Sequence, residues 1–88
     1  YSPQGISPNG DGENDYLVIP SLFTFPPCSI SIYDRSGNLV YFDEVYRNLW
    51  GGKNNKGEDL PDGTYYYVLD FGGQRNNIST FVYISRLL

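Results

Sequence analysis

Apolar and polar positions alternate most clearly in the middle of the chain. In Ser29–Asp34, Ile30 and Ile32 alternate with more polar side chains. A period of two residues places the two sets on opposite faces of a β-strand. The turn Arg35–Asn38 contains glycine and asparagine, which tolerate a positive φ, and Leu39–Asp43 follows it. The pattern therefore predicts a β-hairpin from the two apolar segments.

Two longer strands are predicted in the last third of the chain. Thr64–Phe71 is almost entirely β-branched or aromatic, and Ile78–Ser85 has a similar composition. Such segments, bounded by turn residues, are typical of strands. Alternation divides each strand into an inward and an outward set. The side chains that we expect to face the core are Tyr65, Tyr67, Leu69, Phe71, Val82 and Ile84.

The outward set of these two strands is a candidate partner-binding surface. It consists of Tyr66, Val68, Phe81 and Tyr83, which would lie side by side on neighbouring strands. Contiguous exposed apolar surface on a small domain marks binding sites, and aromatic side chains often anchor interfaces. Cross-strand aromatic pairs also stabilise a hairpin without any partner, and that alternative stays open. As the last strand, Ile78–Ser85 is expected at a sheet edge, where it would also offer backbone pairing.

Weaker signals complete the predicted fold. Tyr16–Ile19 alternates like a strand, a short strand is expected near Tyr46–Trp50, and Trp50 is expected to fill the core. No helical pattern of useful length occurs. Residues 1–15 are expected to form an extended polar loop and residues 16–86 a β-sandwich. The fold class predicted is all-β: one domain over residues 1–88, an immunoglobulin-like antiparallel β-sandwich of about seven short strands.

Composition and charge exclude several classes of function. The 88 residues carry a net charge of −4 and no basic cluster, which removes the electrostatic basis of nucleic-acid binding. The chain has no His, and its acidic residues do not converge in the pattern, so we expect no enzyme. No apolar stretch reaches the roughly 20 residues of a membrane span. The single cysteine, Cys28, is expected to be a half-buried small apolar residue. We expect a monomer.

One loop has the pattern of a cation site. Asn9, Asp11, Glu13 and Asp15 place oxygen atoms at alternate positions, as a Ca²⁺ loop does. The bidentate glutamate of an EF-hand is missing, because Pro20 occupies its position. The competing interpretation, which we favour, is a loop whose side chains bond to its own backbone amides. No other cofactor is predicted.

Several segments together resemble a known family. They are Ser7–Asp15 leading into a strand, the hairpin Ile32–Tyr41, Trp50–Gly52 followed by Gly57, and Leu60–Tyr67. Their order and spacing resemble the gliding-motility-associated C-terminal domain of Bacteroidetes, the type B sorting domain of the type IX secretion system. The resemblance runs from about Ile6 to Arg86. It departs from the family at Gly51, where an aspartate is usual, and this puts the geometry of that loop in question.

The resemblance implies both a role and a location. Such domains lie at the extreme C-terminus of large secreted or surface proteins, and Arg86–Leu88 directly after the last strand fits that position. They carry the upstream passenger through the outer-membrane translocon, recognised by it and its associated shuttle or barrel proteins. Export would pass through the periplasm to the cell surface or the medium. The alternative function is a structural or carbohydrate-binding immunoglobulin-like module of a surface adhesin.

Overall fold

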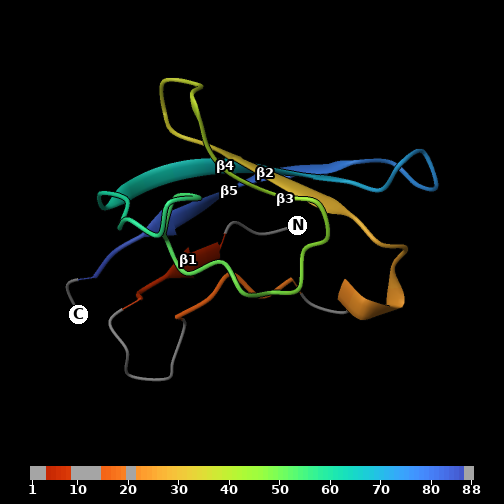
Figure 1. Cartoon of the computed structure of the whole chain (residues 1–88), viewed down its shortest axis with the longest axis horizontal. Helices are drawn as coiled ribbons and strands as arrows, with labels where there is room; N and C mark the ends of the chain where they lie inside the picture. The colour runs from red at the N-terminus through yellow and green to blue at the C-terminus, as the bar shows by residue number, and fades with distance from the viewer. Residues whose placement is uncertain (1–3, 9–14, 20–21, 87–88) are drawn as a thin grey trace.

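A computed structural model describes residues 4–8, 15–19 and 22–86 (Figure 1). They form a single five-stranded sheet with the strand order β1-β5-β4-β2-β3. The pairing is antiparallel throughout, except that β1 runs parallel to β5. One short 3-10 turn, η1, precedes β2. The all-β class is therefore confirmed. The bounds are β1 Gln4–Ile6, η1 Leu22–Thr24, β2 Ser29–Tyr33, β3 Leu39–Asp43, β4 Gly63–Asp70 and β5 Ile78–Ile84.

The hairpin and the two long strands form as their alternation predicts. Asp34 accepts hydrogen bonds from the backbone N–H groups of Ser36 and Asn38, both at 2.9 Å, and thereby shapes the β2–β3 turn. These bonds, chiefly the one from Asn38, lower the pKa of the Asp34 carboxyl group. In β4 and β5 the expected inward set is buried. Its members are Tyr65, Tyr67, Leu69, Phe71, Val82 and Ile84.

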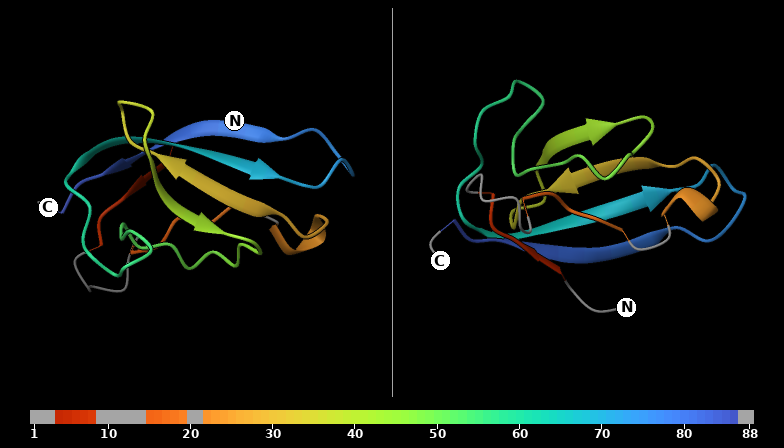
Figure 2. Two further views of the ribbon diagram at one scale, coloured as in Figure 1. Left: turned by 45° about the horizontal axis from the view of Figure 1, so that its top comes forward. Right: turned by 90° about the horizontal axis from the view of Figure 1, so that it is seen from below.

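Irregular chain, rather than a second sheet, covers the inner face of these strands. In Figure 1 the segments 15–19 and 44–52 lie below the sheet, and Figure 2 shows the strands side by side with these segments beneath them. The segments contribute Leu17, Ile19, Tyr46 and Trp50 to the core. Trp50 is only 1% exposed, so its predicted core position is confirmed.

The strands expected at 16–19 and 46–50 do not form, although the alternation of buried and exposed residues in 16–19 is correct. Leu17 donates its N–H to the carbonyl of Trp50 at 2.9 Å. The next inward residue, Ile19, instead donates to the side-chain oxygen of Asn48 at 2.8 Å. Asn48 has a φ of 62°, a left-handed conformation that turns the backbone out of a strand. A regular ladder cannot continue past this residue.

The N-terminal part of the chain differs from the expected loop. Gln4–Ile6 is strand β1, with Ile6 beside Ile84 in the parallel register. Ser85 donates its N–H to the Ile6 carbonyl at 3.0 Å, and the Ile6 side chain is buried. The alternation of apolar and polar residues does not reveal β1, because the strand spans three described residues and is held by a strand nearly 80 residues away in the sequence.

The position of β5 is a second correction. This strand pairs with β4 on one side and with β1 on the other, so it lies inside the sheet. The expectation that the last strand offers a free edge for backbone pairing is therefore wrong. The edges of the sheet are β1 and β3.

Two further features bear on function. Cys28 is 3% exposed, more deeply buried than expected, and burial raises the pKa of its thiol. A protonated, buried thiol is a packing residue rather than a nucleophile. Within the described ranges, no helix is long and apolar enough to cross a membrane.

Candidate functional site

The candidate partner-binding residues lie together on the face of the sheet opposite the core. Tyr66, Phe81 and Tyr83 are 48%, 41% and 52% exposed, and Val68 is half-buried. Tyr66 is the register partner of Phe81, and their ring centroids are 6.4 Å apart at an interplanar angle of 70°. This edge-to-face arrangement is favourable for aromatic pairs. The structure thus brings the four predicted residues together in one patch.

The patch is held by the two most firmly paired strands. β4 pairs over most of its length with β5 and with β2. Tyr67 and Val82, which alternate with patch residues, have no exposed surface. Their packing fixes the strands from below. The exposed rings are therefore presented on a rigid support, which limits the ordering cost of binding.

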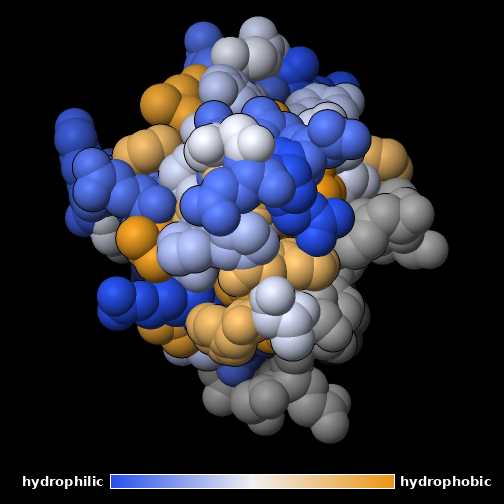
Figure 3. Space-filling model, turned by 90° about the vertical axis from the view of Figure 1, so that its right-hand side faces the viewer, coloured by the Kyte–Doolittle hydropathy of each residue, from blue (hydrophilic) through white to orange (hydrophobic). Residues whose placement is uncertain are grey.

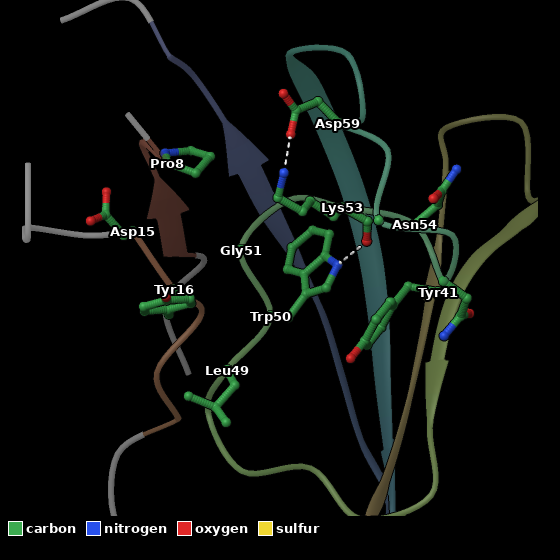
Figure 4. Close-up of a pocket in the computed structure, with 12 residues that line it drawn as sticks. Pro8, Asp15, Tyr16, Tyr41, Leu49, Trp50, Gly51, Lys53, Asn54 and Asp59 are labelled. Carbon is green, nitrogen blue, oxygen red and sulfur yellow. Dashed lines mark hydrogen bonds and ion pairs between the residues drawn. The ribbon is translucent and has the colours of Figure 1, made fainter. Parts of the chain in front are cut away.

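A second feature is a hollow beside Trp50 (Figure 4). Its volume is about 680 Å³. Trp50 donates its indole N–H to the Lys53 carbonyl at 2.8 Å, and Lys53 forms an ion pair with Asp59 at 2.9 Å. The residues lining the hollow are Pro8, Asp15, Tyr16, Tyr41, Leu49, Trp50, Gly51, Lys53, Asn54, Asn55, Gly57 and Asp59.

The polar side chains of this hollow mainly stabilise the loop itself. Asn54 accepts from the N–H groups of Lys56 and Glu58 at 2.9 and 3.0 Å. The hydrogen bond from Lys53, with its charge, lowers the pKa of the Asp59 carboxyl group. A carboxylate held ionised by a neighbouring ammonium group is suited to an ion pair rather than to proton transfer. The hollow therefore has the chemistry of a structured loop.

Of the four candidate calcium ligands, one lies within the described residues. Asn9, Asp11 and Glu13 lie outside the described residues, while Asp15 lies at the rim of the hollow. Among the residues that the structure describes, no three His, Cys, Asp or Glu side chains are grouped to hold a metal ion. Calcium binding by this loop stays a prediction.

Gly51, the residue that departs from the family pattern, is in a crowded place. A Cβ atom there would lie 3.2 Å from the Asp15 carbonyl oxygen and 3.4 Å from the ring of Tyr16. The absence of a side chain lets the 15–19 segment pack closely against the loop. The loop is also held by the hydrogen bond between Leu17 and the Trp50 carbonyl. Its geometry is therefore well defined without the aspartate.

The sequence prediction of the patch did not include two outward residues of the β2–β3 hairpin, Tyr33 and Phe42. Tyr33 is the register partner of Tyr66, and Phe42 is the partner of Ser31 on the same face. Phe42 is 41% exposed. Tyr33 follows the buried Ile32, and Phe42 is more exposed than its neighbours in β3, so the pattern of the two strands could have placed both residues beside the patch.

The far end of the molecule offers a smaller, apolar cavity. It has a volume of about 270 Å³ and lies next to η1, between Phe23 and Val45. Figure 3 views this end, where apolar groups lie among polar ones. Among the described large apolar residues, Phe23 is the most exposed, at 75%. Nothing in the described chain identifies an occupant, but Phe23 provides a useful control position.

Comparison with known protein families finds a match over nearly the whole chain. The sequence model of the CHU_C type IX secretion signal domain matches residues 1–84. Comparison with curated proteins finds no match. The family match covers nearly the whole chain and includes every strand of the sheet. The chain therefore belongs to the family of type IX secretion signal domains.

Proposed function

We propose that this domain acts as a folded C-terminal export signal, read by the type IX outer-membrane translocon and its associated shuttle or barrel proteins. Membership of the family gives the role of secretion targeting, interaction with the secretion machinery and export to the cell surface or the extracellular space. The proposal adds that a large upstream passenger crosses the outer membrane with the domain after transit through the periplasm. Of the two functions that the sequence left open, secretion targeting is the one that the family supports.

The observation that supports recognition of a folded surface is the patch of Tyr66, Val68, Phe81 and Tyr83. Three of these side chains are large, apolar and about half exposed. Contiguous exposed apolar surface on a small domain marks interaction sites, and aromatic side chains supply much of the energy of known interfaces. The competing interpretation is that the Tyr66–Phe81 contact only stabilises the hairpin. The two interpretations differ in what happens to export when folding is preserved.

We further propose that the domain is monomeric and non-catalytic. Its architecture would be related to the immunoglobulin-like sandwich, with the irregular layer in the place of a second sheet. What supports this is the close packing of Leu17, Ile19 and Trp50 against the inner face of the sheet. Two layers around one core are the general plan of such domains. A sedimentation measurement that gave a stable dimer would contradict the monomer.

The test of the proposed function is the double change Phe81→Ser and Tyr83→Ser in an export assay. We expect the variant to fold and the passenger to accumulate in the periplasm. Removing two anchors that contribute about 1.4 kcal/mol each would weaken binding roughly 100-fold. Circular dichroism and the melting temperature check that the variant is folded.

The matched control is the double change Phe23→Ser and Leu49→Ser. It removes the same number of exposed apolar side chains, but outside the outer face of the sheet. This control should be exported like the wild type. Normal export of a folded Phe81→Ser, Tyr83→Ser variant would refute recognition through the patch and leave hairpin stabilisation as its role.

A further inference from the structure

We infer that the recognition surface extends beyond the patch to the whole outer face of β2, β3, β4 and β5, and that it takes an uncharged, apolar partner surface. The partner would dock side chain against side chain and would not add a strand to the sheet. This inference rests on the proposed function, because the partner is taken to be the secretion machinery.

The outer face carries a continuous row of large side chains across four strands. The registers align Phe81 with Tyr66, Tyr66 with Tyr33, and Tyr33 with Leu39. Leu39 is exposed, and Tyr33 is half-buried between its neighbours. Directly opposed residues on neighbouring strands lie about 4.5–5.5 Å apart at Cβ. The row is therefore one surface rather than separate spots.

The same face carries a single charged side chain although 18% of the chain is charged. That residue is Asp70 at the end of β4, where its carboxylate accepts the Gly72 N–H at 2.9 Å. Away from that end of the sheet, the paired positions that alternate with the inward-facing ones hold apolar or hydroxyl-bearing residues. These positions are Ser31, Tyr33, Leu39, Phe42, Thr64, Tyr66, Val68, Ser79, Phe81 and Tyr83. A charged partner surface would lose hydration here without gaining a counter-ion. The complementary surface is therefore apolar and uncharged.

The area of the face also favours the larger surface. With strands about 4.8 Å apart and a rise of about 3.4 Å per residue, two strands of five residues present only about 160 Å², and four present about 320 Å². A stable interface covers about 800 Å² per partner, whereas transient contacts are smaller. The four-residue patch alone is too small for specific recognition. The full face doubles the available area and so moves the surface toward the size of a transient contact.

The edges of the sheet are poorly suited to strand addition. On β3, the side-chain amide of Asn55 pairs with the backbone of Phe42. Its oxygen accepts from the Phe42 N–H, and its nitrogen donates to the Phe42 carbonyl, both at 2.9 Å. An added strand would need these same backbone groups. The other edge, β1, is short in the described part of the chain, where it spans Gln4–Ile6. The outer face is therefore the more accessible route to a partner.

The experiment uses the double change Tyr33→Ser and Phe42→Ser, which leaves the original patch intact. We expect reporter export and binding to the purified type IX translocon complex to fall at least tenfold, with circular dichroism unchanged. Leu39→Lys, which places a charge on the face without removing a buried group, should have the same effect. Leu49→Lys, an exposed position off the face, is its control and should bind normally. Leu39→Lys keeps the test valid if the double variant does not fold.

Salt dependence tests the chemistry of the partner. Between about 0.05 and 0.5 M NaCl, binding should change less than about twofold, because screening acts on charges and not on apolar contacts. A tenfold loss of binding affinity over that range would contradict the inference that the partner surface is uncharged. Normal export by folded Tyr33→Ser, Phe42→Ser and by Leu39→Lys, with Phe81→Ser, Tyr83→Ser defective, would overturn the extended surface and leave the proposed function standing. Normal export by all three variants would overturn both the extended surface and recognition through the original patch.

Discussion

At the scale of single residues, Tyr46 connects segments that do not belong to the sheet. Its buried hydroxyl group donates to the Leu17 carbonyl and accepts the backbone N–H of Trp50 at 3.3 Å. One side chain thus joins the 15–19 segment to the loop that carries the central tryptophan. Burial raises the pKa of the Tyr46 hydroxyl group well above its usual range, because the phenolate would lose its hydration.

This shift predicts how stability depends on alkaline pH. The folded-state pKa of Tyr46 lies above the unfolded value of about 10, so its contribution is complete below that pH and is lost as the pH rises beyond it. The expected slope is up to about 1.4 kcal/mol per pH unit for one group. Tyr46→Phe should reduce the slope, while costing about 1–3 kcal/mol at neutral pH by leaving buried partners unpaired.

Denaturant unfolding at several pH values between neutral and strongly alkaline measures this. Tyr83→Phe, a change at an exposed position, is the matched control and should leave both the slope and the stability near those of the wild type. If Tyr46→Phe retained the full alkaline slope, the loss of stability would have to originate elsewhere.

At the scale of elements, Arg86 fastens the end of β5 to the loop that follows Trp50. Its guanidinium group donates to the carbonyls of Leu60 and Gly52 at 2.6 and 3.1 Å, and it pairs with Asp62 at 2.9 Å. These contacts join positions 24 to 34 residues apart. They hold the loop beside the sheet, where Trp50 fills the core.

A comparison of two glycines in that loop distinguishes the cost of backbone strain from the cost of steric crowding. Gly52 and Gly57 have nearly equal φ values of 80° and 82°. A Cβ at Gly52 would lie 3.1 Å from the Arg86 guanidinium and 3.3 Å from Pro8, whereas Gly57 has nothing within 4 Å. Gly57→Ala should cost about 1–2 kcal/mol from the left-handed backbone alone. Gly52→Ala should cost more, because it also displaces Arg86.

Thermal unfolding of the two variants decides the point. We expect the melting temperature of Gly52→Ala to lie below that of Gly57→Ala by several degrees, since about 1 kcal/mol corresponds to roughly 4–8 °C in a domain of this size. Equal melting temperatures would show that the added methyl group does not disturb the Arg86 contacts, and these contacts would then contribute little to holding the loop in place.

The sequence predicts those elements whose pattern repeats locally. The strands around Ile30, Tyr67 and Val82 were found because each has several alternating residues with one buried face. β1 was missed because Gln4–Ile6 is too short to show a period and depends on a distant partner. The segment near Tyr46 was wrongly expected as a strand, because the left-handed Asn48 has no alternation signal.

The candidate surface was predictable for a similar reason. Outward positions follow from inward ones, so Tyr66 and Phe81 could be placed on one face from the alternation alone. Their extension to Tyr33 depends on the order of the strands, which brings β2 beside β4 and which periodicity does not contain. The hollow beside Trp50 could not be foreseen either, since it lies between segments that are distant in the sequence, such as those joined by the hydrogen bond from Leu17 to Trp50.

At the scale of the whole molecule, the loop from Asn9 to Asp15 raises the question of metal dependence. An ion bound only by the folded state at 100 times its Kd would stabilise it by about 2.7 kcal/mol, which corresponds to more than about 10 °C in melting temperature. We expect chelation with EDTA to shift the melting temperature by less than about 2 °C, because the loop lacks a bidentate glutamate. A large decrease that added Ca²⁺ reverses would establish a calcium site.

We propose that this domain is itself sufficient to direct export and is read as a folded surface. The most direct measurement is the fraction of a reporter that reaches the cell surface or medium when residues 1–88 are fused to its C-terminus, in cells with a type IX system. We expect efficient export with the wild-type domain, and periplasmic retention with the folded Phe81→Ser, Tyr83→Ser domain or in cells without the translocon. Retention of the wild-type fusion in competent cells, or equal export of the folded variant, would contradict the account.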